Sequence, residues 1–390
     1  MKQIMVLTSA RADYGLLSGL IKKLASDERV RVRLVVTGMH LSPEFGLTYK
    51  EIEKDGIKID RKIEILMSSD TPVSVSKTMG MAMISFADYI EEVHPDALLV
   101  LGDRYETLAV CCVALNARIP IIHLHGGETT EGAIDEAIRH SITKMSFLHF
   151  TSTEEYRRRV IQLGENPERV YNVGSLGVEN VLGQPLLSKK DLESELNLRL
   201  DMAYAVVTYH PVTLEDKNVC ETVKKFLDAL DRNEDMYYII TKANSDAGGR
   251  QINQMLEEYA AHRNNVQVYD SLGMIKYLSA VKYSKMVIGN SSSGILEVPS
   301  FGIPTVNVGD RQKGRIRAES VIDCKEDTES IVEAIKKAKT LEFRKLCSHV
   351  KNPYEGVRTS DTIVEIIKKK IFDETVDIKK KFYDIEMRAV

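Results

Sequence analysis

The chain has little net charge and no long apolar run. Its 53 basic and 57 acidic side chains leave a formal charge of −4, so we expect no broad electrostatic surface for nucleic acid or anionic lipid. No uninterrupted apolar stretch approaches the roughly 18 residues that a membrane-spanning helix needs. We therefore predict neither nucleic acid nor membrane as a partner, and any anion-binding site must be local.

Paired cysteine motifs are also absent. The five cysteines lie without CxxC spacing or histidine companions at positions 111, 112, 220, 324 and 347. This pattern favours reduced core thiols over a disulfide framework or a zinc site. The segment Met1-Lys2-Gln3-Ile4 runs directly into a predicted strand and leaves no room for a secretory signal, so we expect a cytoplasmic protein.

Two common nucleotide motifs are missing as well. Neither GxGxxG nor the Walker A pattern occurs, which disfavours a tightly bound NAD or a P-loop nucleotide. What the chain does have is a regular alternation of short apolar runs and amphipathic helices, typical of parallel sheets covered on both faces. The strands predicted from this alternation are 3–7, 33–37, 97–101, 119–124 and 148–151, then 205–208, 238–241, 266–269, 286–288 and 305–308. The helices predicted between the strands of the first half are 16–25, 75–93, 105–116 and 135–145.

With 390 residues, the chain is long enough for two domains. The segment Leu182–Leu187 interrupts the pattern and predicts a linker between doubly wound α/β domains at 1–180 and 188–364, followed by a helical tail at 365–390. We interpret Lys379–Lys381 in that tail as a solvated charge run. Two such domains predict a ligand cleft between them, facing the carboxyl ends of both sheets.

Polar residues follow several strands of the first half. Arg11, after the first strand, offers the planar donors that suit a phosphate, although a surface ion pair is the better explanation of Arg11 taken alone. Asp103, beside Arg104 at the end of strand 97–101, is either a catalytic acid or base or a helix N-cap. The residues alone leave these alternatives open.

A denser group of ionisable residues follows strand 119–124. It contains His125 and Glu128 around a Gly-Gly turn, and then Asp135, Arg139 and His140 on the next helix. The spacing does not match a metal-ligand set. So many ionisable groups exceed what a solvated loop needs, and they favour an acid/base cluster.

In the second half, the strongest local pattern is Asn290-Ser291-Ser292-Ser293-Gly294, where an apolar strand opens into small hydroxyl residues. Free backbone N–H groups at such a turn favour a phosphate, and the cations of Gly309–Arg315 follow the next strand. His210, after strand 205–208, can donate to a phosphate or a sugar hydroxyl, or be merely structural. Asn244 and Asp246 lie in another polar loop on the same rim.

Together, the segments SARADYG, TGMH, GDRYE, HLHGGE, DEAIRHSITKMS, TSTEEYRRRVIQLGE, GNSSSG and GDRQKGR resemble the hydrolysing UDP-N-acetylglucosamine 2-epimerases, especially the bacterial members of the sialic acid pathway. The similarity covers essentially the whole chain. It implies a glycosyltransferase-B type fold with UDP held mainly by the second domain and a C-terminal helix returning to the first. It also implies a homodimer or homotetramer. The implied reaction converts UDP-GlcNAc and water to N-acetylmannosamine and UDP, without metal or cofactor, by anti elimination of UDP and syn hydration of the glycal.

The resemblance also implies roles for individual residues. Asp103 and Asp135 match the family's catalytic aspartates, Glu128 is a third candidate, and His210 matches the histidine near the diphosphate. This chain has His125 where some members have a catalytic glutamate, so either His125 or Glu128 takes that role. The residues expected to bind the substrate or UDP are Arg11, His40, Arg104, Asn244, Asp246, Ser271, Leu272, Asn290, Ser291, Ser292, Gly294, Glu297, Arg311 and Arg315.

Other functions remain compatible with this sequence. A hydrolysing epimerase of the analogue UDP-2,4-diacetamido-2,4,6-trideoxyglucose, as in legionaminic acid synthesis, would differ only in contacts to C4 and C6 of the sugar. A non-hydrolysing epimerase would return a UDP-sugar. A retaining glycosyltransferase shares the fold but needs no carboxylate cluster, and a regulatory sugar-nucleotide-binding protein would tolerate Asp103→Asn or Asp135→Asn.

Overall fold

The computed structural model describes residues 1–67, 71–129, 134–210, 219–243 and 249–385. The strands in these ranges are β1 Lys2–Thr8, β2 Val30–Thr37, β3 Arg61–Ile63, β4 Ala97–Leu101, β5 Ile121–Leu124, β6 Leu148–Thr151, β7 Val170–Asn172, β8 Tyr204–Thr208, β9 Tyr237–Thr241, β10 Val266–Tyr269, β11 Met286–Gly289, β12 Thr305–Val308 and β13 Val321–Cys324. The α-helices are α1 Arg11–Ser26, α2 Tyr49–Lys54, α3 Pro72–Val93, α4 Tyr105–Asn116, α5 Asp135–Met145, α6 Glu154–Gln162, α7 Leu176–Gly183, α8 Lys189–Leu196, α9 Val219–Asp231, α10 Gly249–Ala261, α11 Gly273–Tyr283, α12 Ser293–Leu296, α13 Thr328–Lys339, α14 Leu341–Cys347 and α15 Thr359–Ile367.

These residues form two compact units. The first unit contains the described residues up to Asn180 together with those from Gly356 onward, and the second unit contains those of 181–355. The first sheet has the order β3-β2-β1-β4-β5-β6-β7 and the second the order β10-β9-β8-β11-β12-β13. All neighbouring strands are parallel. The two doubly wound α/β domains expected from the sequence are confirmed.

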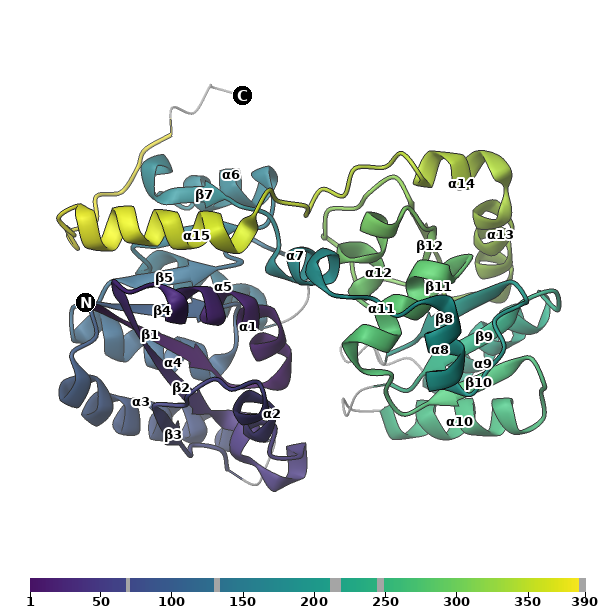
Figure 1. Ribbon diagram of the computed structural model, residues 1–390, viewed down its shortest axis with the longest axis horizontal. Helices are drawn as coiled ribbons and strands as arrows, with labels where there is room; N and C mark the ends of the chain where they lie inside the picture. Colours follow the sequence, from purple (N-terminus) through teal and green to yellow (C-terminus); the bar gives the residue numbers. More distant parts are fainter. Residues whose placement is uncertain (68–70, 130–133, 211–218, 244–248, 386–390) are drawn as a thin grey trace. The chain divides into compact units, whose positions relative to one another are not determined.

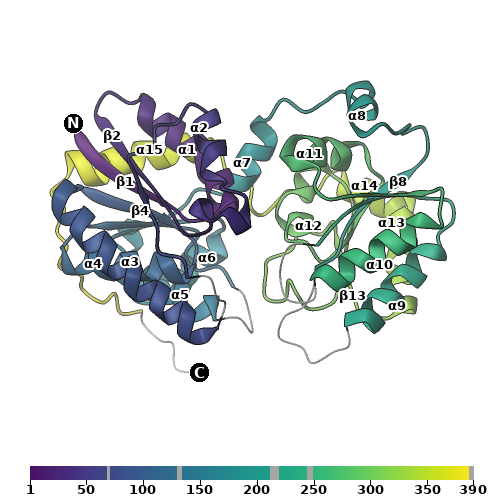
Figure 2. The ribbon, with the colours of Figure 1, turned by 90° about the horizontal axis from the view of Figure 1, so that it is seen from below.

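Helices cover both faces of the first sheet because its strands are apolar on both sides. One apolar cluster joins the sheet to α1 and α15 through Leu17 and Ile363, and another joins it to α3, α4 and α5 through Phe86 and Ile142. Figure 2 shows α1 and α15 on one side of this sheet and α3, α4 and α5 on the other.

The second sheet follows the same plan. One of its apolar clusters contains Phe226 of α9, Leu256 of α10 and Ile335 of α13. The opposite face packs Leu192 of α8 and Val281 of α11. In both sheets the order of strands reverses direction at a switch point, between β1 and β4 in the first and between β8 and β11 in the second. Open α/β sheets bind ligands beyond the carboxyl ends of the strands at such a point.

The end of the chain returns to the first unit (Figure 1). The hydroxyl of Thr359 donates to the carbonyl oxygen of Val173 at 2.7 Å, and the backbone N–H of Ser360 donates to the carboxylate of Glu179. Beyond them, α15 continues into a π-helical turn, and Ile367 and Ile371 complete the apolar cluster over α1. The return of the C-terminal helix to the first domain is therefore present in the fold.

The three lysines of the charge run in the tail are exposed, as the sequence predicts, but the amine of Lys380 is bound to the first unit. Lys380 donates to the carbonyl oxygens of Lys144 and Ser146 at the end of α5, both at 2.7 Å, and pairs with Glu165. Glu165 is itself buried and also contacts Lys144 and His149. Lys380 thus fixes the tail to the first unit.

Within the described ranges, no helix is both long enough and apolar enough to cross a membrane.

Candidate functional site

The loops after β4, β5 and β6 bring together the acid/base residues of the first unit. Arg139, on α5, joins two of these loops from a buried position. Its Nη2 forms an ion pair with Asp103, its Nη1 donates to the carbonyl oxygen of Glu128 at 2.7 Å, and it also pairs with Glu136. Arg139 therefore holds the Asp103 carboxylate beside the backbone of the loop that carries Glu128.

Asp103 does not cap the helix that follows it. The N-cap position of α4 belongs to Arg104, so the capping alternative is wrong. Burial raises the pKa of the Asp103 carboxyl, the charges of Asp135 and Glu128 raise it further, and Arg139 opposes them. A carboxyl group with a raised pKa at a strand end is typical of acid/base catalysts. Asp135 lies at the start of α5 and is partly exposed.

His125 and Glu128 face each other across the Gly-Gly turn. His125 Nδ1 lies 3.3 Å from Glu128 Oε1, which also accepts a hydrogen bond from Ser152 at 2.7 Å. His125 has a left-handed backbone with φ of 64°, and its buried Nε2 has no hydrogen-bond partner in the described part of the chain. Unusual backbone conformations of this kind gather at functional sites. The pair has the geometry of an imidazole oriented by a carboxylate.

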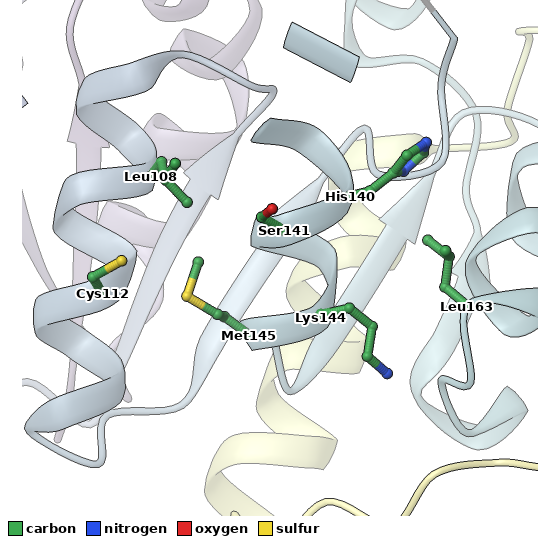
Figure 3. Close-up of a pocket in the computed structure, with 7 residues that line it drawn as sticks. All are labelled: Leu108, Cys112, His140, Ser141, Lys144, Met145 and Leu163. Atoms are coloured by element: carbon green, nitrogen blue, oxygen red, sulfur yellow. The ribbon is translucent and has the colours of Figure 1, made fainter. Parts of the chain in front are cut away.

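Within the described residues, His140 forms no hydrogen bond or ion pair with Asp103, His125 or Glu128 and is linked to Arg139 through Glu136. Its Nε2 lies 3.1 Å from Glu136, and its ring lines a separate pocket between α4 and α5 (Figure 3). Leu108 and Cys112 of α4 and Met145 of α5 make that pocket largely apolar. We therefore leave His140 out of the acid/base cluster.

Arg104 and His40 lie on the β1–β2 side of the same edge. The Nε of Arg104 donates to Glu106 Oε1 at 2.5 Å, and its Nη2 contacts the sulfur of Met39. His40 is fully buried, and its two ring nitrogens contact the hydroxyls of Thr8 and Thr48. The buried position of His40 suits a residue that holds the loop after β2 in place rather than one that contacts a ligand.

Arg11, at the start of α1, is exposed, and its Nε lies 3.4 Å from Glu51. A ligand anion could displace this weak surface pair, so the phosphate role of Arg11 stays a prediction.

In the second unit, His210 and Asn290 meet at the switch point between β8 and β11. Asn290 is fully buried, accepts a hydrogen bond from the His210 backbone N–H at 2.7 Å and donates to its carbonyl oxygen at 2.8 Å. The Asn290 carbonyl oxygen in turn accepts from Arg311 and from Gln312. Four predicted or neighbouring site residues thus form one connected group at the sheet edge where a ligand is expected.

The serine-rich loop leads into the short helix α12. This helix contains only four residues, so its macrodipole adds little attraction for a phosphate. Ser291 and Ser292 are partly exposed, whereas the hydroxyl of Ser293 donates to Glu297 at 2.5 Å. Gly294 packs directly on Thr305, where a Cβ atom would lie 2.7 Å from its methyl group. Phosphate binding here must rest on backbone N–H groups and on Arg311.

The remaining predicted ligand residues are spread over the second unit. Burial raises the pKa of the Glu297 carboxyl. Arg315 is partly exposed and accepts a hydrogen bond from Arg317 through its carbonyl oxygen. Ser271 is exposed and its hydroxyl accepts from the backbone N–H of Gly273, while Leu272 is buried in the core. Asn244 and Asp246 lie outside the described residues.

Sequence reasoning missed two residues of the site, Ser152 and Gln312. Ser152 orients Glu128, and the amide of Gln312 supports Asn290. Ser152 directly follows β6, and Gln312 lies in the loop after β12. Their positions after parallel strands could therefore have marked them as candidate site residues. Among the described residues, no group of three or more histidine, cysteine or acidic side chains could hold a metal ion.

Comparison with known proteins covers almost the whole chain. The family model described as UDP-N-acetylglucosamine 2-epimerase matches residues 22–368. The chain is 43% identical over 385 residues to a Campylobacter jejuni protein named GDP/UDP-N,N'-diacetylbacillosamine 2-epimerase (hydrolyzing), covering 98% of this chain and 99% of that one. It is 40% identical over 386 residues to the Escherichia coli polysialic acid biosynthesis protein P7, covering 99% and 98%.

The fold has a close counterpart among solved structures. The UDP-GlcNAc 2-epimerase of Neisseria meningitidis, solved bound to UDP-GlcNAc, superposes with a TM-score of 0.81 at 19% identity, covering 95% of this chain and 100% of the other. At that identity the likeness concerns the fold alone, and it agrees with the glycosyltransferase-B type expected from the sequence.

Proposed function

Because the chain belongs to the UDP-N-acetylglucosamine 2-epimerase family, we propose that it is a hydrolysing 2-epimerase that releases a free 2-acetamido sugar from its nucleotide. Its first candidate substrate is UDP-N,N'-diacetylbacillosamine, the diacetamido sugar weighed above as the alternative. This choice is supported by the Campylobacter relative, which is named for this sugar linked to GDP or UDP and is similar over essentially its full length.

The proposed reaction needs three proton transfers. The proton on C2 of the sugar has no adjacent carbonyl to acidify it, so departure of the nucleoside diphosphate must lead and build positive charge at C1. A base then removes the C2 proton and leaves a glycal. Hydration of the glycal requires an acid that protonates C2 from the opposite face and a base that takes a proton from the attacking water.

The observation that carries the proposal is the environment of Asp103. Its raised pKa arises from burial and from the neighbouring Asp135 and Glu128, and Arg139 keeps the carboxyl oriented. Two carboxyl groups in unlike environments, Asp103 paired with Arg139 and Asp135 in the first turn of α5, suit the opposite proton transfers at C2. We assign these two steps to them.

The third transfer, from water, is left to the pair His125 and Glu128. The distance of 3.3 Å between His125 Nδ1 and Glu128 Oε1 orients the ring and leaves Nε2 as its working atom. Of the two candidates for the glutamate of other family members, we favour His125 as the base and Glu128 as the group that orients it.

The second unit is proposed to hold the leaving diphosphate. His210, fixed through its backbone by Asn290, and Arg311 beside it offer donors and positive charge at the switch point of the sheet. Ser291 and Ser292 add hydroxyls and backbone N–H groups in the same loop.

UDP-GlcNAc is the second candidate substrate, because the description of the matching family names that sugar. With it the product would be N-acetylmannosamine, a precursor for sialic acid, and the polysialic acid relative at 40% identity favours such a role. We also propose that the protein acts in the cytoplasm as a homodimer or homotetramer, which light scattering of the purified protein would test.

The deciding experiment incubates the protein with each UDP-sugar in deuterated water and follows the products by NMR. We expect UDP and a free sugar that is inverted and deuterated at C2, with a higher kcat/KM for the diacetamido substrate. A product still attached to UDP would indicate a non-hydrolysing enzyme. Failure to consume either sugar would overturn the proposal.

A further inference from the structure

His123 is a fully buried polar side chain in an otherwise apolar strand. Successive residues of β5 face opposite sides of the sheet, so Ile122 and Leu124 point toward the α1 side and His123 toward the α5 side. Its in-register neighbour on β6 is His149, which is buried to the same extent. A buried imidazole in such a row needs hydrogen-bond partners, and those partners indicate what it does.

The ring of His123 contacts the turn that carries Asp103. Its Nε2 lies 2.8 Å from the carbonyl oxygen of Gly102, a residue with φ of 76° at the end of β4. Burial lowers the pKa of His123 to about 3, so the ring is neutral and has a single N–H. Only an N–H can bind a carbonyl oxygen, which places the proton on Nε2 and leaves Nδ1 as an acceptor.

The other side of the ring contacts the loop and helix that carry the remaining acid/base groups. Nδ1 lies 3.3 Å from the hydroxyl of Thr143, whose single proton is shared between Nδ1 and the carbonyl oxygen of Arg139, 3.0 Å away. A Cβ atom on Gly126 would lie 3.1 Å from Nδ1, so the Gly-Gly turn before Glu128 rests directly on the imidazole. One side chain therefore touches the three segments that bear Asp103, Arg139 and Glu128.

We propose that His123 is a positioning residue for catalysis, holding the Gly102–Asp103 turn against α5 and the His125–Glu128 loop. This inference rests on the proposed function, because the proposed function assigns a proton transfer to Asp103. His123 touches no reacting atom. Its neutral ring supplies a fixed donor beneath Asp103, and small displacements of a catalytic group are costly: about 1 Å can reduce turnover roughly 100-fold.

Charged or titratable groups face His123 from each neighbouring element. They are His125 in the loop directly after β5, His149 on β6 and Arg139 on α5. All three disfavour protonation of the ring, in the same direction as burial. The neutral donor is therefore maintained by its whole surroundings, whatever the ionisation of Asp103.

The test compares substitutions that keep or remove the donor. In His123→Gln the side-chain amide reaches the position of Nε2, whereas in His123→Asn it reaches only that of Nδ1, and His123→Leu removes both. His149→Leu is the matched control, since His149 is equally buried in the next strand but contacts Glu165 and not Gly102. Turnover is measured with UDP-N,N'-diacetylbacillosamine and with UDP-GlcNAc, together with the melting temperature of each variant.

We expect kcat to fall about 10- to 100-fold in His123→Leu and His123→Asn, with KM within about threefold, and to recover to within about fivefold in His123→Gln. His149→Leu should lower the melting temperature but keep kcat within about twofold. Hydrogen exchange of the segment 97–106 should accelerate in His123→Leu and not in His149→Leu, a readout that needs no activity. Equal kcat in the Gln and Asn variants, or an effect no larger than that of His149→Leu, would overturn the inference.

Failure of the proposed function looks different. If the proposed function is wrong, the wild-type protein consumes neither sugar. If only the positioning role is wrong, the wild-type protein is active, and substitutions of His123 change neither its turnover nor its local hydrogen exchange.

Discussion

Asp103 and Glu128 share one arginine although they follow different strands. Arg139 pairs with the Asp103 carboxylate by one nitrogen and binds the Glu128 carbonyl oxygen by another. Because the guanidinium is planar and always charged, it fixes both the distance between the two loops and the electrostatic field at Asp103. The chemistry assigned to single residues therefore depends on this pairing.

Removing the Asp103 carboxylate should stop the reaction without unfolding the protein. We expect Asp103→Asn to reduce kcat roughly 100- to 10,000-fold, since a positioned acid or base contributes that range. Asp60→Asn is the control, because Asp60 is also partly buried and paired with an arginine, Arg33. Asp60 directly precedes β3 at the amino end of the strands, whereas Asp103 follows β4 at the carboxyl end. Steady-state kinetics of both variants measures the contrast, and comparable losses of kcat in the two would contradict the assignment.

The pH profile should report on Asp103 and its arginine. The raised pKa of Asp103 means that a base at this position is active above that pKa and is lost as the pH falls through it. Arg139 lowers this pKa, so Arg139→Gln should move the acidic limb of kcat/KM to higher pH. Arg158→Gln, an exposed change on α6, should leave the limb in place. An unmoved limb in Arg139→Gln would assign the titration to another group.

At the scale of elements, the sequence predicted the central strands and one edge strand, β10, but missed the other three edge strands. The strands β3, β7 and β13 were not expected, and all three lie at an edge of their sheet. Edge strands are short and less buried, so polar residues such as Arg61 and Lys62 interrupt the apolar signal. The central strands, paired and covered on both sides, have the continuous apolar runs by which they were recognised.

The site was predictable in part for the same reason. Polar residues placed directly after central strands, such as Asp103, His125 and Asn290, are visible in the sequence. Their pairings are not, because Arg139 is 36 positions from Asp103 and Ser152 is 24 positions from Glu128. The attachment of Lys380 to α5 spans 236 positions and gave no local signal at all.

The tail contact predicts a stability that depends on pH. Burial alone would raise the pKa of Glu165, but hydrogen bonds from His149, Lys144 and Lys380 lower it to about 2, below its ordinary 4.5. The ionised carboxylate therefore stabilises the fold fully above about pH 4.5, and this contribution is lost as the pH falls toward 2. We expect Glu165→Gln to lower the free energy of unfolding by roughly 2–3 kcal/mol at pH 7 and by much less near pH 3.

Urea unfolding at pH 7, 4 and 3 measures this difference. Glu168→Gln, an exposed substitution three residues away, should follow the unchanged protein at every pH. A constant deficit for Glu165→Gln across the pH range would mean that packing, and not the charge, carries the effect.

At the scale of the whole molecule, we assign acid/base chemistry to the first unit and UDP binding to the second. Variants of the two units should therefore differ in their affinity for UDP. Asn290→Ala removes the amide that binds both backbone groups of His210, and we expect the Kd for UDP to rise about tenfold. Asp103→Asn should bind UDP as the unchanged protein does. Calorimetric titration with UDP measures both, with Asn265→Ala, an amide bound to Met236 elsewhere in the second unit, as control. Weaker UDP binding in Asp103→Asn alone would reverse the assignment.

The return of the C-terminal helix has a consequence for the order in which the protein is made. The second unit is encoded between the two pieces of the first. The helix α15 supplies Ile363 and Ile367, and the π-helical turn after it supplies Ile371, to the apolar cluster over α1. During translation, the second unit can close while this face of the first still lacks its cover. Until residues 359–371 have left the ribosome, Leu17 and Leu24 of α1 lack the apolar contacts that this segment provides. We therefore expect ribosome-bound chains that stop before residue 356 to bind chaperones more strongly than the completed chain does.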